Sequence, residues 1–322
     1  MKICEKHACS FQNWYPKFKR WTTRSEFVKV PDEVLSYLKS DLVMVPSEAV
    51  LETKKTSEVD DVTFTTWESD GEDEDEDAPP MPTFPEFSCD LKKAMDRLGG
   101  KVFVKLNWSA PYDASWIATN NSLKCSNLQD IYLLLKGSNR IARDLESFKN
   151  RDLDCVIVLR MWEDIHPGSE FRCFVSDGQL IAITQRDKSE FHKHIPQYKC
   201  NIVNDIRSFF EESLKGEFIL SSYAFDVIWK VSQVKLVDLN LFSEAENDSF
   251  LFTWDELKDM QFVEGVSPEF RYIGEEVGIQ PANLSRHFGL PSDLTDMPES
   301  TSRSIIEMIQ NNIDLQISEM NN

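Results

Sequence analysis

The chain has 322 residues, of which 41% are hydrophobic and 28% charged, a balance typical of a globular protein with a buried core. Its 35 Lys and Arg against 55 Asp and Glu give a net charge of −20, which argues against a general binder of nucleic acid or anionic membranes. No apolar run reaches the roughly 18 residues of a membrane span, and the seven cysteines are scattered. We therefore expect a cytoplasmic protein with reduced thiols and no membrane or nucleic-acid partner.

The negative charge is concentrated in one segment. Residues 58–77 contain eleven acidic residues and no Lys or Arg. Self-repulsion and the prolines that follow leave this segment little apolar surface to bury, so we predict a disordered loop over residues 53–83.

Hydrophobic spacing and end signals predict the elements of the first half of the chain. Gly99-Gly100 should end a helix over residues 87–98, and Ser126 should cap a helix over residues 127–136, which ends before Gly137. The nearly continuous apolar run Cys155–Trp162 predicts a buried strand. The other predicted elements are helices over residues 31–38, 87–98 and 127–136 and a strand over residues 101–106.

The second half is richer in strands. Asp177-Gly178 separates two apolar runs and predicts a β-hairpin. A long helix over residues 202–214 should end before Gly216, and strands are predicted over residues 223–230 and 234–240. Helices mixed with antiparallel hairpins indicate the α+β class rather than a doubly wound sheet.

Two carboxylates interrupt the last pair of strands. If residues 231–233 form the loop, Asp226 lies directly opposite Asp238, about 5 Å away, whereas a two-residue loop would place it diagonally. Asp238 and Asn240 share a face by alternation. Facing carboxylates repel each other, so a cation would hold the pair, and this oxygen set suits Mg²⁺ beside phosphates. The alternative is an edge hairpin with solvent-facing polar residues.

Several cations lie in apolar strands. Lys105, Arg160 and Arg172 need anionic partners if buried, and either a triphosphate or structural salt bridges would supply them. Separately, His192, His194 and Cys200 are either metal ligands or exposed polar residues at the start of a helix.

Sequence blocks spread over about residues 10–260 resemble the cell division cycle protein 123 family. The matching blocks are Trp14-Tyr15-Pro16, Phe84-Pro85-Glu86-Phe87, Lys105-Leu106-Asn107-Trp108-Ser109-Ala110-Pro111, Asp113-Ala114, Ser122-Leu123-Lys124-Cys125, Phe171-Arg172-Cys173-Phe174-Val175, Gln185-Arg186-Asp187, Phe225-Asp226-Val227 and Leu251-Phe252-Thr253-Trp254. After Asp238-x-Asn240 the family usually has Pro-Phe-Gly-Glu, whereas this chain has Leu241-Phe242-Ser243-Glu244.

The resemblance implies an α+β, ATP-grasp-like fold that holds ATP and Mg²⁺ in the cleft between two lobes. Residues 1–52 would form an N-terminal element that packs on the first lobe, residues 84–165 the first lobe and residues 166–260 the second lobe. Residues 261–322 would be a C-terminal extension that is partner-binding or partly disordered.

The resemblance also implies roles for individual residues. Lys105 and Arg172 would contact phosphates, the segment Arg160–Trp162 would line the adenine site, and Glu170 would face the ribose. The metal ligands would be Asp226, Asp238 and Asn240. The full set of implied cofactor-binding residues is Lys105, Asn107, Ala110, Asp113, Arg160, Trp162, Glu170, Arg172 and Arg186.

The family acts as an assembly chaperone of eukaryotic translation initiation factor 2 (eIF2). The resemblance therefore implies that this chain, as a monomer, binds the gamma subunit of eIF2 and so supports translation initiation and cell-cycle progression. Whether ATP is hydrolysed stays open. The alternative function is an ATP-grasp ligase that joins a carboxylate to an amine.

Two further expectations concern the partner surface and the metal site. Large aromatic residues near a chain end are typical interface anchors, so Trp14-Tyr15-Pro16 and the C-terminal region are a candidate partner face, unless these aromatics pack on the lobe behind them. Replacement of Asp238 should not destabilise the ligand-free protein, because it relieves repulsion from Asp226.

Overall fold

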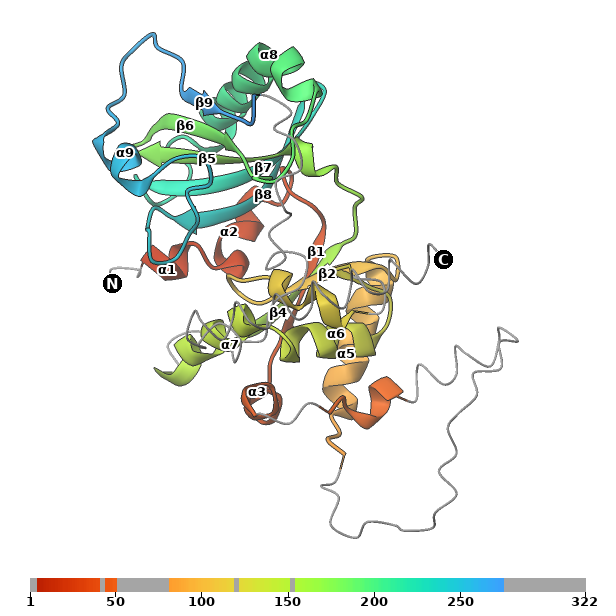
Figure 1. Ribbon diagram of the computed structural model, residues 1–322. Helices are drawn as coiled ribbons and strands as arrows, with labels where there is room; N and C mark the ends of the chain where they lie inside the picture. The colour runs from red at the N-terminus through yellow and green to blue at the C-terminus, as the bar shows by residue number, and fades with distance from the viewer. Residues whose placement is uncertain (1–4, 41–43, 51–80, 119–121, 151–153, 275–322) are drawn as a thin grey trace, which may run out of the picture.

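The computed structural model describes residues 5–40, 44–50, 81–118, 122–150 and 154–274. The predicted acidic loop, residues 53–83, therefore lies outside the described residues except for its last three. Most of the predicted C-terminal extension also lies outside them. The described residues form two lobes, each built on its own β-sheet (Figure 1). The α+β class and the two-lobe arrangement are thereby confirmed.

The first lobe is the lower part of Figure 1 and has a four-stranded antiparallel sheet in the order β1-β4-β2-β3. Its hydrophobic core lies between this sheet and the helices that cover it. The strands are β1 Ser25–Lys29, β2 Val102–Lys105, β3 Lys124–Cys125 and β4 Val156–Met161. The helices include α3 Asp32–Lys39, α5 Pro85–Arg97, α6 Leu128–Lys136 and α7 Asn139–Glu146, with the short 3₁₀ helices η1 Tyr112–Ile117 between β2 and β3 and η2 Ser147–Asn150 after α7.

The ends of these helices follow local chemistry. Gly99 and Gly100 after α5 have φ angles of 92° and 76°, which glycine adopts without steric cost. The cap of α6 is Asn127, whose side chain accepts a hydrogen bond from the backbone of Asp130. The predicted cap at Ser126 is wrong, because the backbone N–H of Ser126 instead donates to the Asp130 carboxylate at 2.8 Å.

The second lobe has a five-stranded sheet in the order β8-β7-β5-β6-β9. Helix α8 packs on one face of this sheet, and α9 packs on the other (Figure 1). The strands are β5 Glu170–Ser176, β6 Gln179–Gln185, β7 Tyr223–Lys230, β8 Gln233–Leu241 and β9 Glu269–Arg271. The helices are η3 Pro167–Ser169, α8 His194–Phe209, a π-helical turn over Phe210–Leu214 and α9 Trp254–Asp259.

The hairpin of β5 and β6 is confirmed. Asp177 and Gly178 have φ angles of 49° and 73°, as a type I′ turn requires. Strand β9 was not predicted. It pairs in parallel with β6, so the second sheet includes residues beyond the expected lobe boundary at residue 260.

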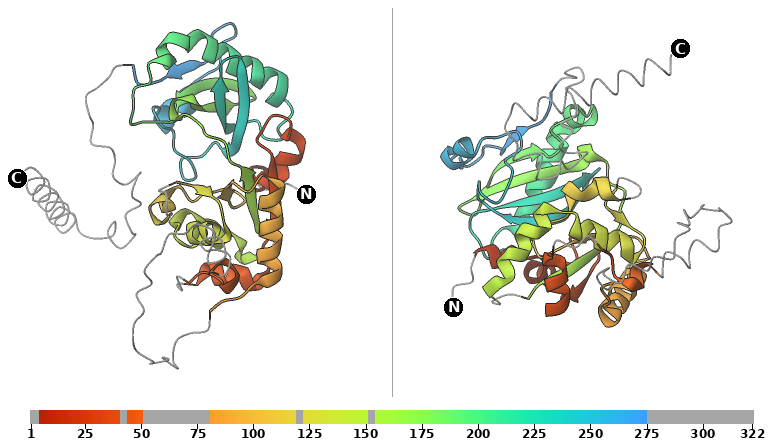
Figure 2. Two further views of the ribbon diagram at one scale, coloured as in Figure 1. Left: turned by 90° about the vertical axis from the view of Figure 1, so that its right-hand side faces the viewer. Right: turned by 60° about the horizontal axis from the view of Figure 1, so that its bottom comes forward.

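The N-terminal segment lies between the lobes (Figures 1 and 2). It contains α1 Glu5–Ala8 and α2 Phe11–Phe18. The buried side chains of α2 pack in the core of the second lobe, while β1 and α3 belong to the first lobe. The expectation that residues 1–52 pack on the first lobe therefore holds for β1 and α3 but not for α2. Between α2 and β1, the carbonyl of Trp21 accepts a hydrogen bond from Leu236 of β8 at 2.8 Å.

The aromatic block of α2 is part of this core. Trp14 is only 2% exposed and its ring centroid lies 4.4 Å from that of Phe11. The Tyr15 hydroxyl accepts a hydrogen bond from the backbone of Ser25 at 2.9 Å. The hypothesis that Trp14 anchors a partner surface is therefore wrong, and the alternative of packing on the lobe behind it is correct.

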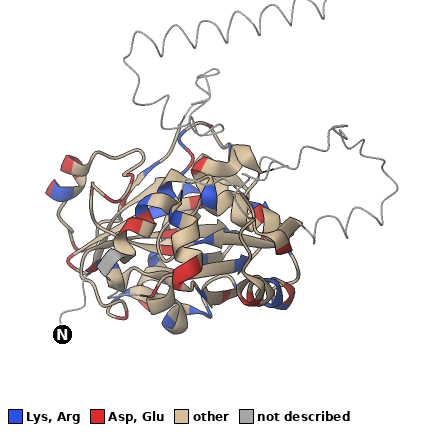
Figure 3. Ribbon diagram, turned by 90° about the horizontal axis from the view of Figure 1, so that it is seen from below, with Lys and Arg blue, Asp and Glu red and all other residues tan. Residues whose placement is uncertain are grey.

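Three global expectations can be compared with the described residues. Acidic and basic positions are interspersed through the helices and strands (Figure 3). No helix in the described part of the chain is long and apolar enough to cross a membrane. The cysteines described there are free, and burial raises the thiol pKa of four of them, Cys9, Cys125, Cys155 and Cys173.

Replacing the buried Trp14 should test the role of α2 as core. We predict that Trp14→Ala lowers the free energy of unfolding by about 3–5 kcal/mol, because it leaves a large cavity. Trp116→Ala is the matched control, since Trp116 is 43% exposed, and should change stability by less than about 0.5 kcal/mol. Denaturant unfolding of both variants measures this difference, and equal losses would contradict it.

Candidate functional site

The hairpin of β7 and β8 places Asp226 opposite Asp238, as predicted, but for a different reason. Its turn has two residues, Val231 and Ser232, so the shorter of the two loops left open by the sequence is the one observed. A β-bulge at Val237 then adds one residue to β8, so that Val227 pairs with Leu236 and Asp226 with Asp238. The bulge restores the register that the shorter turn would have shifted.

The same bulge connects the two lobes. The carbonyl of Val237 accepts a hydrogen bond from Arg160 Nη1 at 2.8 Å, and Arg160 Nη2 donates to Thr22 Oγ1 at 3.2 Å. Arg160 is on β4 of the first lobe and is 7% exposed. Its guanidinium lies 5.1 Å from the centroid of the Phe11 ring, a cation–π contact. A predicted adenine-site residue thus joins both sheets and the N-terminal segment.

Lys105 forms a second connection between the lobes. It is the last residue of β2 and only 1% exposed, and its Nζ lies 2.5 Å from Asp238 Oδ2 on β8. Burial lowers the pKa of the Lys105 ammonium, while the charge of Asp238 acts in the opposite direction. The two residues therefore form an ion pair across the two sheets, largely shielded from water.

Arg172 and Asp226 form a bidentate ion pair inside the second lobe. Arg172 Nε and Nη2 lie 2.7 and 2.8 Å from the two oxygens of Asp226, which is 3% exposed. Burial alone would raise the pKa of Asp226, but the charges of Arg172 and Arg186 lower it below its usual range. Asn240 completes the predicted metal set, with its Nδ2 3.4 Å from Asp226 Oδ2.

Arg186 has one donor that makes no hydrogen bond with the residues that the structure describes. Its Nη1 lies 2.5 Å from Glu170 Oε2, whereas its buried Nε lacks a hydrogen-bond acceptor there and is 3.9 Å from Asp226 Oδ1. Burial alone would lower the pKa of Arg186, and the carboxylates of Asp226 and Glu170 reverse this effect and raise it. We call the set of these paired groups the charged cluster: Lys105, Arg160, Arg172, Arg186, Glu170, Asp226 and Asp238.

Four of the predicted cofactor residues lie outside the hydrogen bonds of this cluster. The buried Asn107 binds the carbonyl of Asp154 at 3.0 Å and the N–H of Val156 at 2.9 Å. Asp113 accepts from Ser138 Oγ at 2.6 Å beside the start of α7. These contacts give both residues a role in holding the first lobe. The other two are the buried Ala110 and the half-buried Trp162.

Sequence reasoning missed the segment that follows β8. Phe250 has a φ of 57°, a left-handed conformation that is unusual for a bulky residue. Its ring centroid lies 5.0 Å from the guanidinium of Arg172 and 5.6 Å from that of Arg186. The carbonyl of Asp248 also accepts from Arg172 Nη1 at 2.9 Å. Strained residues of this kind concentrate at functional sites, but no local pattern marks position 250 in the sequence.

The departure from the family pattern after Asn240 leaves the strand intact. Leu241 still pairs with Tyr223, and Phe242 packs on Trp254 with ring centroids 5.3 Å apart. Ser243 does not have the positive φ that would require glycine. The lost Pro and Gly therefore do not prevent β8 from presenting Asp238 and Asn240 next to Asp226.

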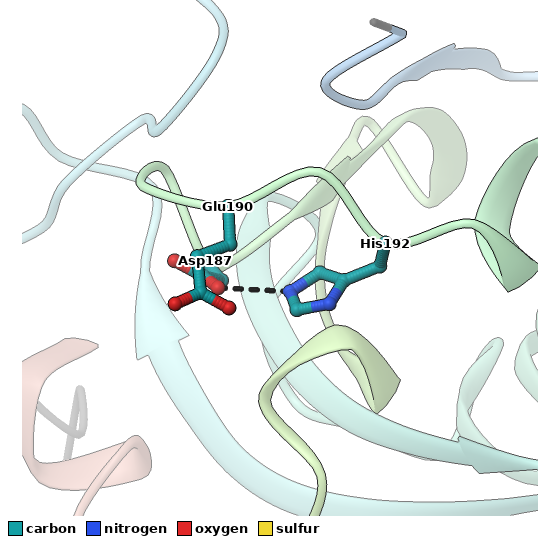
Figure 4. Close-up of side chains that lie close together, drawn as sticks. All are labelled: Asp187, Glu190 and His192. Carbon is teal, nitrogen blue, oxygen red and sulfur yellow. Dashed lines mark hydrogen bonds and ion pairs between the residues drawn. The ribbon is translucent and has the colours of Figure 1, made fainter. Parts of the chain in front are cut away.

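The histidines form a cluster of their own beside the charged cluster. His192 Nε2 lies 2.8 Å from Asp187 Oδ2, and Glu190 stands nearby (Figure 4). His194 Nε2 lies 3.0 Å from the carbonyl of Gly168. Asp187 also accepts two hydrogen bonds from Ser189. Of the three residues that the sequence suggested as metal ligands, only His192 belongs to this group, in which one carboxylate oxygen of Asp187 pairs with His192 and the other accepts from Ser189.

The ion pairs reverse one expectation about the ligand-free protein. The sequence predicts that removal of Asp238 relieves repulsion and costs no stability. In the structure, Lys105 and Arg172 already neutralise the two facing carboxylates. Loss of Asp238 would leave the buried Lys105 ammonium without its partner, so the ligand-free protein should become less stable.

Comparisons with known proteins identify similar chains. The family model D123 matches residues 14–298. The Translation initiation factor eIF2 assembly protein of Xenopus tropicalis is 39% identical over 312 residues, 90% of each chain. The protein of the same name from Dictyostelium discoideum is 35% identical over 94% of each chain. The structure of C-terminally truncated Cdc123 from Schizosaccharomyces pombe is 29% identical, with a TM-score of 0.68 over 84% of this chain and 97% of that one.

The pair of Arg172 and Asp226 should dominate stability in this site. We predict that Arg172→Met lowers the free energy of unfolding at pH 7 by about 3–5 kcal/mol, because Asp226 stays buried without its main partner. The loss relative to wild type should shrink below about pH 4, because the stabilisation from the wild-type pair is lost progressively as the pH falls from the ordinary pKa of an Asp towards the lowered pKa of Asp226.

The control is Arg97→Met, which removes an exposed pair with Glu26 and should cost less than about 1 kcal/mol at either pH. Denaturant unfolding at both pH values measures the two losses. A loss for Arg172→Met that matches the control, or that grows as the pH falls, would contradict the assigned pairing.

Proposed function

The chain belongs to the D123 family, and from this membership and the charged cluster we propose that it is an ATP-binding assembly chaperone of eIF2. In this proposal it binds the gamma subunit of eIF2 and promotes assembly of the trimeric complex. The proposal of nucleotide binding rests on Arg186, which belongs to the charged cluster with Lys105, Arg160 and Arg172. Its buried Nε has no hydrogen-bond partner among the described residues.

The cations of the charged cluster suit a triphosphate. Lys105 and Arg160 come from the first lobe, and Arg172 and Arg186 come from the second. Phosphates placed between the lobes would accept hydrogen bonds from both sides, which suits a ligand carrying several negative charges in a protein that is acidic overall. The Nε of Arg186 offers such a ligand a donor that makes no hydrogen bond within the described part of the chain.

The donor set beside these cations fits Mg²⁺. Asp226, Asp238 and Asn240 provide oxygen ligands on two adjacent strands, held in register by the bulge at Val237. When bound, Mg²⁺ would neutralise phosphate charge. The residues themselves orient the ligand: Lys105 and Arg172 would hold phosphates, and Glu170 would face the ribose. Trp162, at the end of β4, would line the adenine site with Arg160.

The partner part of the proposal follows from family membership. The relatives from Xenopus tropicalis and Dictyostelium discoideum carry the name eIF2 assembly protein and match 90% or more of this chain. Trp14 is buried, so the partner face must use other residues. No observation on the described residues favours the ligase alternative, because the carboxylates of the charged cluster are paired with cations rather than free to act as a base.

Nucleotide binding predicts ligand-dependent stabilisation. Mg-ATP at about 100 times its Kd should raise the free energy of unfolding of the wild type by about 2.7 kcal/mol. Arg186→Met should lose most of this gain, because it removes the Nε donor that has no hydrogen-bond acceptor among the described residues. Thermal unfolding with and without Mg-ATP measures the gain, and Arg97→Met, with its exposed pair, should keep it. An equal gain in Arg186→Met, or none in the wild type, would contradict the site.

Partner binding predicts selective capture. The full chain, immobilised, should retain purified eIF2 gamma subunit but not the isolated alpha or beta subunit. Failure to retain the gamma subunit would contradict the proposed chaperone function.

A second experiment tests the ligase alternative. Incubation of the chain with Mg-ATP and candidate carboxylic acids and amines should release no ADP in step with a ligated product. Stoichiometric release of ADP with product would favour the ligase.

A further inference from the structure

The carboxylates of the candidate metal site are already bound by the chain. Arg172 holds both oxygens of Asp226, and Lys105 holds Oδ2 of Asp238. Asp238 Oδ1 accepts from the backbone of Leu239 at 3.1 Å. A divalent cation that entered alone would have to displace one of these cations and then lie beside it. In a site this dry, like charges at such distances repel strongly.

The two ion pairs differ in how easily they open. The pair of Arg172 and Asp226 has two parallel hydrogen bonds, and Arg172 is also held by the carbonyl of Asp248 and the ring of Phe250. Lys105 holds Asp238 through a single ammonium on a flexible stem. The Asp238 side chain is also the more exposed carboxylate, at 18% against 4% for Asp226. The pair of Lys105 and Asp238 is therefore the one that a ligand would open.

Lys105 has a further contact in the position in which it pairs with Asp238. Its ammonium lies 5.2 Å from the centroid of the Phe11 ring, which also faces Arg160 at 5.1 Å. This ring would continue to attract both cations if Asp238 were released. A phosphate group would draw Lys105 from Asp238, because it carries more negative charge than one carboxylate.

We propose that the site takes nucleotide before metal: Lys105 blocks Asp238 in the empty site, and binding of nucleotide phosphates by Lys105 releases Asp238 for Mg²⁺. This inference rests on the proposed function of the site as a nucleotide site. It assigns Lys105 two successive roles, as the partner that stabilises the empty cleft and as the group that makes metal binding depend on nucleotide.

The first test measures binding of Mn²⁺, a probe for the Mg²⁺ site, by electron paramagnetic resonance of the free ion. The wild-type full chain should bind Mn²⁺ weakly alone and at least about tenfold more tightly with ATP, after the Mn²⁺ bound by ATP in a protein-free sample is subtracted. Lys105→Met should bind Mn²⁺ alone about tenfold more tightly than the wild type does, because Asp238 is free. Lys235→Met is the matched control, since Lys235 also pairs with a carboxylate, Glu163, at 2.6 Å, and it should behave as the wild type.

The second test uses a variant of Asp238 and does not depend on the folding of Lys105→Met. Asp238→Asn should bind metal-free ATP, measured with EDTA present, several-fold more tightly than the wild type, because Lys105 is no longer engaged and a negative charge is removed. The same variant should lose the ATP-dependent binding of Mn²⁺.

The outcomes separate this inference from the proposed function. Tight binding of Mn²⁺ alone by the wild type, or weaker binding of metal-free ATP by Asp238→Asn, would overturn the order of binding and leave the nucleotide site standing. Absence of ATP binding by the wild type, with and without Mg²⁺, would overturn the proposed function itself. Tighter binding of Mn²⁺ alone by Lys105→Met, together with tighter binding of metal-free ATP and loss of ATP-dependent Mn²⁺ binding by Asp238→Asn, would support the inference.

Discussion

Burial of charge between two sheets is the constraint on which this structure depends. A charged group removed from water must find an opposite charge or a set of hydrogen bonds, because the desolvation cost is several kcal/mol per ion. Here the partners come from different lobes, so satisfying the charges also fixes the lobes against each other. Lys105 of β2 reaches Asp238 of β8, and Arg160 of β4 reaches the carbonyl of Val237. Polar residues thus join the lobes at this boundary, together with apolar side chains of β4, Val156 and Val158, which pack in the second core.

The bulge at Val237 shows how sequence reasoning can reach a correct register by a wrong route. Alternation and turn length place Asp226 opposite Asp238 only if the loop has three residues. The actual turn has two, and one extra residue in β8 restores the pairing. Nothing in Val-Lys-Leu-Val-Asp marks the bulge, and the side chain that binds the carbonyl of the bulged residue, Arg160, is distant in the sequence. The functional register is therefore a tertiary feature.

Helices and turns could be predicted where the residues that specify them lie close together in the sequence. Asp177-Gly178 specifies its turn by φ, and the hydrophobic spacing specifies α5 and the second half of α8, which begins eight residues before the predicted start at residue 202. The errors concern contacts between distant residues. Trp14 has the composition of an interface anchor, and only the fold shows that it packs in the second lobe. The cation set was predicted from polar residues in apolar strands, but Phe250, which lies against two of those cations, has no signature in the sequence.

Strand β9 has a consequence for how this chain can be shortened. It covers the outer edge of β6 by parallel pairing at Ala182, Ile183 and Thr184, and Arg271 is further fixed by Glu256 at 2.9 Å. A fragment ending at the expected lobe boundary of residue 260 would lose this cover and expose the unpaired backbone of an apolar strand. Such an open edge recruits strands from other molecules. Self-association of a fragment of that length would therefore reflect the exposed edge, and would carry no information about the oligomeric state of the intact chain.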